Sequence, residues 1–254
     1  MIERPYVLCE TTWSTVENQR YEVAVLPWGA TEAHNYHLPY GTDNYETEAV
    51  ALEAGRIAWE GGARVIVLPG IPYGVNTGQL DIPLTINLNP STQLQVLRDI
   101  ADSLVRSGVE RLVVVNGHGG NEHKALIREL QGSHKLLIAL VNWWSIESGK
   151  DYFDDPGDHA GELETSMMQH IAPELVLPLE RAGNGNARSA RLAALKEGWA
   201  WVPRRWTQVT QDTGVGDPRA ATPVKGQRFF EVVTNKLAAF LIGFSNADPA
   251  ALYE

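Results

Sequence analysis

The chain has 254 residues, of which 44% are hydrophobic and 20% are charged, and this balance excludes a mainly disordered protein. Its formal net charge of −10 argues against a protein that binds nucleic acid or docks on an anionic membrane, because both need a basic surface. Its one cysteine cannot form an internal disulfide, and no apolar run approaches the ~18 residues of a membrane span. Charged residues also interrupt the N-terminal stretch, which is apolar in a signal peptide. We therefore expect a cytoplasmic protein.

Short apolar runs alternate with amphipathic stretches along the chain. The predicted strands are the β-branched runs at residues 23–27, 64–68, 112–115 and 136–141. The predicted helices are the segments with helical apolar spacing at residues 43–59, 91–107, 120–130, 161–172 and 230–244. Strands that alternate with helices imply parallel crossovers, so we expect an α/β fold in which helices cover both faces of a mostly parallel sheet. No linker interrupts this pattern, and residues 1–254 are predicted to form a single domain.

Histidines and carboxylates gather after the predicted strands, where parallel sheets bind their ligands. Glu32, His34 and Asp43 follow the first strand, and His118 follows the third within the run NGHGGN at residues 116–121. Imidazole combined with carboxylate is the ligand set of Zn, Mn, Fe or Co. Alternate residues of an extended segment point to opposite sides, so two metals could each take Glu32 or His34, with Asp43 bridging them. The alternative is that these are loop residues and that Asp43 only caps the following helix.

A third polar segment, DHAGELETS, spans residues 158–166. We predict that His159 transfers a proton and that Glu162 is a metal ligand. On a helix, Glu162 and Glu164 lie about 200° apart and cannot both face one metal. Glu164 is therefore expected to contact the metal ligands, or to have a structural role, and not to bind the metal itself. The alternative reading treats these acids as the first turn of a helix, where the helix dipole favours negative charge. Aromatic residues at Trp143 and Trp144, just after the fourth strand, are placed to line a pocket wall.

These motifs resemble those of the creatininase family, the creatinine amidohydrolases and their relatives. The matching segments are residues 29–43 (GATEAHNYHLPYGTD), 116–121 (NGHGGN), 159–166 (HAGELETS) and 214–226 (GVGDPRAATPVKG). The resemblance implies a three-layer αβα domain, a centre of two divalent metals and hydrolysis of an amide-type C–N bond in a small-molecule substrate. Zinc is the first expectation for the metal, with Mn, Fe or Co as alternatives. The resemblance also implies a compact homo-oligomer, with a hexamer as one arrangement.

Matched position by position, the resemblance implies that Glu32, His34, Asp43 and His118 bind the metals, with Asp43 bridging, and that His159 is the catalytic histidine. Further residues of the matching motifs and the predicted pocket wall are expected to support the ligands or contact the substrate; these are His37, Asn121, Glu164, Trp143 and Trp144.

Two departures from creatininase itself affect the expected substrate. The family's Tyr and metal-binding Glu after the Gly-His step are replaced here by Gly119 and Gly120, and its substrate-lining Trp corresponds to Asp155. Glu162 looks like the replacement ligand, and creatinine is not the expected substrate. We therefore expect an amidohydrolase that acts on an amide, formamide or cyclic amide other than a peptide bond. The alternatives are a metal-dependent hydrolase or lyase of a sugar-like or keto substrate, and a non-catalytic binding module.

Overall fold

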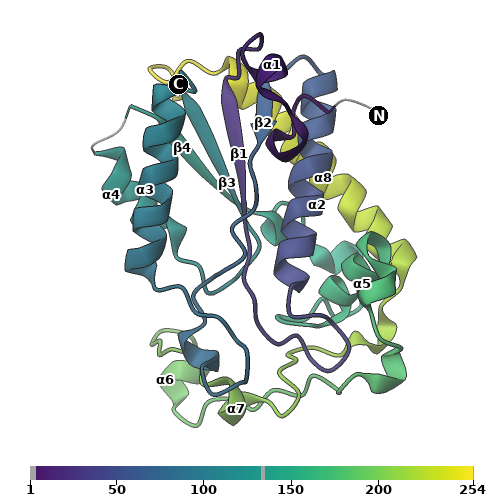
Figure 1. The fold of residues 1–254 in the computed structure, drawn as a ribbon. Helices are drawn as coiled ribbons and strands as arrows, with labels where there is room; N and C mark the ends of the chain where they lie inside the picture. The colour runs from purple at the N-terminus through teal and green to yellow at the C-terminus, as the bar shows by residue number, and fades with distance from the viewer. Residues whose placement is uncertain (1–3, 133–134, 254) are drawn as a thin grey trace.

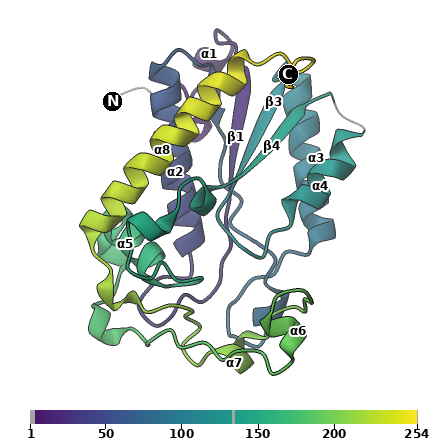
Figure 2. The same ribbon diagram turned by 180° about the vertical axis from the view of Figure 1, so that it is seen from behind.

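A single parallel sheet forms the centre of the molecule. The computed structural model describes residues 4–132 and 135–253, and Figures 1 and 2 show it from opposite sides. The strands are β1 (Val23–Trp28), β2 (Val65–Val67), β3 (Arg111–Asn116) and β4 (Leu137–Asn142). They pair in the order β2-β1-β3-β4, and every pairing is parallel. Each predicted strand is confirmed, with its ends displaced by at most one residue.

The α-helices of the described residues are α1 (Trp13–Val16), α2 (Thr42–Glu60), α3 (Pro90–Arg106), α4 (His123–Gln131), α5 (Glu162–Ile171), α6 (Ala193–Lys196), α7 (Trp206–Val209) and α8 (Pro223–Asn246). The predicted helical segments correspond to the longer ones, which are α2, α3, α4, α5 and α8. Helix α8 begins about two turns earlier than predicted, because the Thr222 hydroxyl accepts a hydrogen bond from the Lys225 amide and Pro223 occupies the first turn. Helix α4 begins later than predicted, because the chain first turns tightly at Gly120, where a Cβ atom would lie 2.3 Å from the Val75 carbonyl oxygen.

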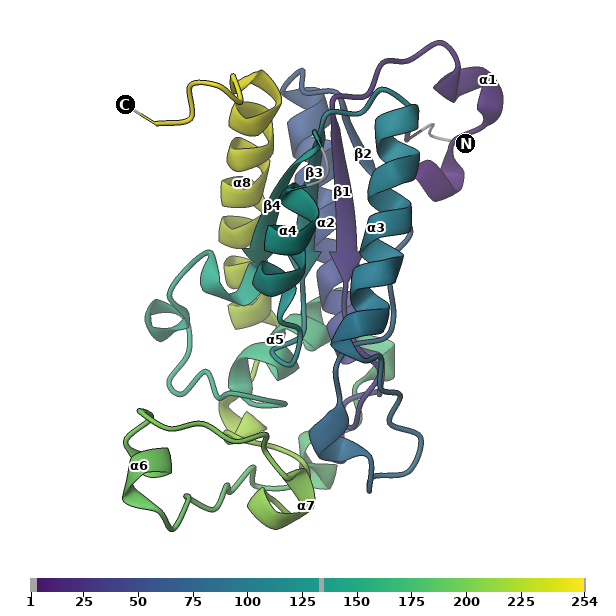
Figure 3. The same ribbon diagram turned by 90° about the vertical axis from the view of Figure 1, so that its left-hand side faces the viewer.

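Helices cover both faces of the sheet, which confirms the three-layer αβα expectation (Figure 3). Successive residues of a strand point to opposite faces. Val23 and Val25 of β1 therefore pack with α2 and α8, whereas Ala24 and Leu26 pack with α3 and α4. Helix α5 lies against α8. No helix of the described residues is long and apolar enough to cross a membrane.

The sheet register brings the loops that carry the polar motifs to one edge. Trp28 at the end of β1 pairs with Asn116 at the end of β3, which pairs with Asn142 at the end of β4. The segments that follow these residues leave the sheet side by side. In Figure 3 the strand arrows point toward the end of the molecule where α5, α6 and α7 gather. The functional residues are therefore expected between these strand ends and the covering segments.

Candidate metal centre

The loop after β1 and the start of α2 bring Glu32, His34 and Asp43 together. All three side chains are buried, with exposed fractions of 1%, 0% and 2%. The His34 Nε2 atom lies 2.9 Å from Asp43 Oδ1. The loop after β1 can pass this close to the first turn of α2 because residue 29 is glycine. A Cβ atom at residue 29 would lie 2.9 Å from the backbone nitrogen of Asn44.

His118 reaches the same cluster from the loop after β3. Its Nδ1 atom lies 2.9 Å from Glu32 Oε1 and 3.0 Å from Asp43 Oδ2. The loop can approach α2 because residue 117 is glycine, since a Cβ atom there would lie only 1.6 Å from the Thr47 hydroxyl. Each carboxylate oxygen of Asp43 thus faces a different histidine, Oδ1 facing His34 and Oδ2 facing His118.

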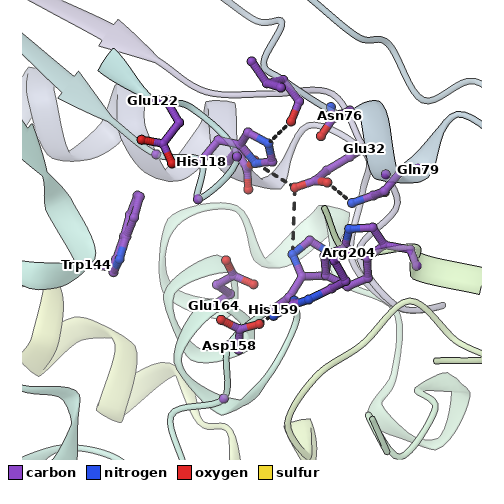
Figure 4. Close-up of a pocket in the computed structure, with 18 of the residues that line it drawn as sticks. Glu32, Asn76, Gln79, His118, Glu122, Trp144, Asp158, His159, Glu164 and Arg204 are labelled. Atoms are coloured by element: carbon purple, nitrogen blue, oxygen red, sulfur yellow. Dashed lines mark hydrogen bonds and ion pairs between the residues drawn. The ribbon is translucent and has the colours of Figure 1, made fainter. Parts of the chain in front are cut away.

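The segment that leads into α5 supplies His159, and the first turn of α5 supplies Glu164. The ring of His159 lies 4.2 Å from that of His34, and its Nδ1 atom is 3.8 Å from Glu32 Oε1 (Figure 4). The other ring nitrogen, Nε2, lies 2.9 Å from the Ala33 carbonyl oxygen and must donate to it. The Glu164 carboxylate accepts a hydrogen bond from the Ala160 amide.

Glu162 does not join the cluster that we expected it to join. Its Oε1 atom lies 2.5 Å from Lys225 Nζ, and its Oε2 atom accepts a hydrogen bond of 2.9 Å from the Asp155 amide. The helical geometry correctly separates Glu162 from Glu164, but it is Glu164 that faces the centre, whereas Glu162 faces the start of α8. Lys225 lies in the segment 214–226, which matches the family motifs. Its positive charge was the one local indication that it could pair with a carboxylate such as Glu162.

The remaining predicted residues lie behind the cluster or along the cavity. His37 Nε2 lies 2.9 Å from the Thr165 hydroxyl, and burial lowers the pKa of His37 to about 4. The side chain of Asn121 accepts hydrogen bonds from the Val75 amide and from Gln93, so it holds the loop around His118. Trp143 and Trp144 both line the cavity described below, as predicted.

Gln79 is a site residue that the sequence motifs did not indicate. The residue is 1% exposed, and its side-chain amide nitrogen donates to the Glu32 carboxylate (Figure 4). Its Oε1 atom has no hydrogen-bond partner among the described residues. Gln79 lies in the short 3-10 helix Thr77–Gln79, in a loop without a recognisable pattern, so only the folded chain brings it to Glu32.

The donor set fits divalent transition metals. Three overlapping groups, each with its ligand atoms within 4.8 Å of one another, are Glu32–Asp43–His118, His34–Asp43–Glu164 and Glu32–His34–His159. Each group combines imidazole with carboxylate, as Zn, Mn, Fe and Co sites do. Asp43 belongs to the first and second groups, which suits a carboxylate shared by two cations.

The electrostatics of the cluster show how strongly these groups are coupled. Burial alone would lower the pKa of His34, but the Asp43 carboxylate raises it to about 10. Burial would raise the pKa of Asp43, but His34 and His118 hold it well below its usual range. Burial also raises the pKa of Glu164. A bound cation can take over the role of the protonated imidazoles in compensating these buried carboxylates.

A cavity of about 660 Å³ opens directly onto the cluster. Glu32, Asp43, His118, His159 and Glu164 lie in its wall. The remaining wall includes Trp143 and Trp144, Gln79, Glu122, and the distant segment that carries Trp201, Arg204 and Trp206. The candidate centre is therefore accessible to a ligand.

Comparison with known proteins places this fold and site in one family. A family model described as creatinine amidohydrolase matches residues 9–241. A mycofactocin precursor peptide peptidase from Mycobacterium ulcerans is 32% identical over 233 residues, which cover 87% of this chain and 81% of that protein. The creatinine amidohydrolase of Pseudomonas putida is 29% identical over 198 residues, 66% of this chain and 72% of that protein.

Solved structures agree with this assignment. The crystal structure of a Bacteroides fragilis protein assigned as a creatinine amidohydrolase superposes with a TM-score of 0.93 and 41% identity, and covers 100% of both chains. A Zn-Zn type creatininase mutant has the same fold, with a TM-score of 0.78 and 24% identity over 96% of this chain and 100% of that chain. The resemblance seen in the sequence motifs is confirmed, and the chain belongs to the creatininase family of amide hydrolases.

Proposed function

We propose that this protein is a dinuclear metal-dependent amidohydrolase. The observation that carries the proposal is the position of Asp43, whose two carboxylate oxygens face His34 and His118 separately. One cation would be held by Glu32, Asp43 and His118, and the other by His34, Asp43 and Glu164. Zinc is the proposed metal, and Mn, Fe or Co would accept the same ligands. When bound, two such cations lower the pKa of a shared water and polarise the scissile carbonyl.

His159 is the proposed proton carrier. Its Nε2–H donates to the Ala33 carbonyl, which leaves the lone pair on Nδ1 directed toward Glu32 and the cavity. Nδ1 can take a proton released when water attacks the amide carbonyl and give it to the leaving nitrogen, so that an acid and an amine are formed. The ring of Trp206, 4.6 Å from that of His159, shields this imidazole from solvent on one side.

The proposed reaction covers amide bonds in general. We expected bonds other than peptide bonds, but relatives named as peptide peptidases are as similar to this chain as the Pseudomonas putida creatinine amidohydrolase. A binding module without activity would have no use for a proton carrier beside the metal ligands, and this favours an enzyme.

Metal analysis combined with amine release tests the proposal. The purified chain is loaded with zinc, freed of excess metal, and offered a panel of peptide and non-peptide amides. We expect about two zinc ions per chain and amine release that stops after chelation. A chain that retains no zinc, or a loaded chain that releases no amine from any member of the panel, would contradict the proposal.

A further inference from the structure

A segment from the distant part of the chain forms part of the cavity wall. We call residues 199–207 the strap. On one side, the carbonyl oxygen of Arg204 packs so closely on Gly78 that a Cβ atom there would lie 1.9 Å from it, and the Thr207 hydroxyl donates to Asp81. On the other side, Arg204 Nη1 lies 2.6 Å from Asp158 Oδ2 (Figure 4). The strap is therefore fixed to both walls of the cavity.

The strap presents aromatic rings to the cavity. Trp206 lies between His159 and Arg204, with its ring 4.6 Å from the imidazole and 4.8 Å from the guanidinium carbon. Trp201 also lines the cavity, yet 80% of its surface is exposed. An exposed indole in the wall of a cavity offers apolar surface that a ligand can cover.

Trp199 provides a contrast within the same strap. It is 74% exposed, and its indole nitrogen donates to Glu197 at 2.9 Å. Among the described residues that line the cavity, Trp201 is present and Trp199 is not. The two indoles thus share chemistry, exposure and chain position, and differ in whether they face the cavity.

Other apolar residues also line the cavity. Pro203 of the strap is in its wall, and so are Trp144, Pro156 and Leu163 from outside the strap. The volume of about 660 Å³ lies in the range of pockets that enclose ligands much larger than a single small ring.

We propose that the strap forms a subsite for a bulky aromatic or apolar group that flanks the scissile amide, with Trp201 as a residue that determines specificity. This inference deepens the proposed function and rests on it for the position of the scissile bond. It makes the preferred substrate an amide with a large apolar side group rather than a small polar amide. Trp201 touches the flanking group and takes no part in the bond cleavage itself.

A matched pair of variants tests the subsite. Binding of N-acetylglycinamide and N-acetylphenylalaninamide to the metal-loaded protein is measured by calorimetry, and hydrolysis is followed separately by amine release. We expect the aromatic compound to bind at least about tenfold more tightly. Trp201→Ala should remove most of this preference and leave the affinity for the glycine compound unchanged. Trp199→Ala should leave both affinities unchanged, and both positions are exposed enough to tolerate alanine.

The outcomes separate the two proposals. Equal affinity of the wild-type protein for both compounds, including no measurable binding of either, would overturn the subsite, as would equal losses in the two variants. Selective binding of the aromatic compound without amine release from any amide would leave the subsite standing and overturn the proposed function alone.

Discussion

Lys225 forms an ion pair with the buried carboxylate of Glu162, with 2.5 Å between Nζ and Oε1. The same ammonium group lies 2.9 Å from Asp154 Oδ2, so one lysine joins both ends of the loop that carries His159. The loop contains a strained residue, because Ala160 adopts a positive φ angle of 49°, which is costly for a residue other than glycine.

Replacement of Lys225 by Met should therefore misplace His159 without removing a metal ligand. We expect kcat to fall by up to about 10²-fold with unchanged metal content, because small displacements of a catalytic group are costly. Lys236→Met is the control, since Lys236 also lies on α8 and forms one ion pair, with Glu147, but is half exposed and does not contact Asp154 or Glu162. Steady-state kinetics of both variants check the prediction, and similar losses in the two would contradict it.

In the proposed site Glu164 takes the metal-ligating role that we had expected for Glu162, and metal analysis can test this assignment. Glu164→Gln should lower the metal content from about two ions to about one per chain, because the amide is a poor substitute for a carboxylate ligand. Glu162→Gln should retain both ions and lower the melting temperature, because it weakens the pair with Lys225. Loss of a metal ion from Glu162→Gln but not from Glu164→Gln would contradict this assignment and make Glu162 the ligand.

Substitution of His159 by Asn should lower turnover by about 10²–10⁴-fold and leave the metal content unchanged. The loss should be smaller for amides whose amine leaves easily, such as 4-nitroanilides, because these need less protonation of the leaving nitrogen. Comparison of anilides with alkyl amides measures this dependence. Loss of a metal from the variant would instead make His159 a ligand, as its proximity to Glu32 and His34 allows.

The buried His123 should make stability depend on pH. Its side chain is 0% exposed, neither ring nitrogen has a hydrogen-bond partner among the described residues, and burial lowers its pKa to about 4. An unfolded chain binds a proton at this position below about pH 6.5, whereas the folded chain resists protonation down to about pH 4. Its contribution to stability is therefore present above pH 6.5 and is lost as the pH falls toward 4.

His123→Leu should remove this loss. Between pH 7.5 and pH 5 the free energy of unfolding of the wild-type protein should fall by about 2 kcal/mol more than that of the variant. Denaturant unfolding of both proteins without metal measures the difference. Parallel pH profiles would show that His123 does not titrate in this way.

Much of the fold could be predicted because its signals are local. The runs around Val23–Trp28 and Arg111–Asn116 are apolar and rich in β-branched residues, and burial on both faces of a parallel sheet requires that composition. The motif residues at Glu32, His34, Asp43 and His118 met at one sheet edge because the strands that precede them end in register.

The rest of the site depends on contacts that have no local signal. Periodicity separates Glu162 from Glu164 but cannot tell which of them faces the centre, since this depends on where α8 places Lys225. Gln79 and Trp206 lie in two short helices that are far apart in the sequence, and only the folded chain brings both to the cavity. The start of α8 was missed because its apolar face begins well after its capping residue, Thr222.

The proposed centre holds two cations that share Asp43. Diffraction data collected on the zinc-loaded protein just above and just below the zinc absorption edge locate these cations. We expect two anomalous peaks roughly 3.5 Å apart, with a carboxylate oxygen of Asp43 next to each peak and Glu164 next to the one beside His34. A single peak, or two peaks of which only one touches Asp43, would contradict this expectation.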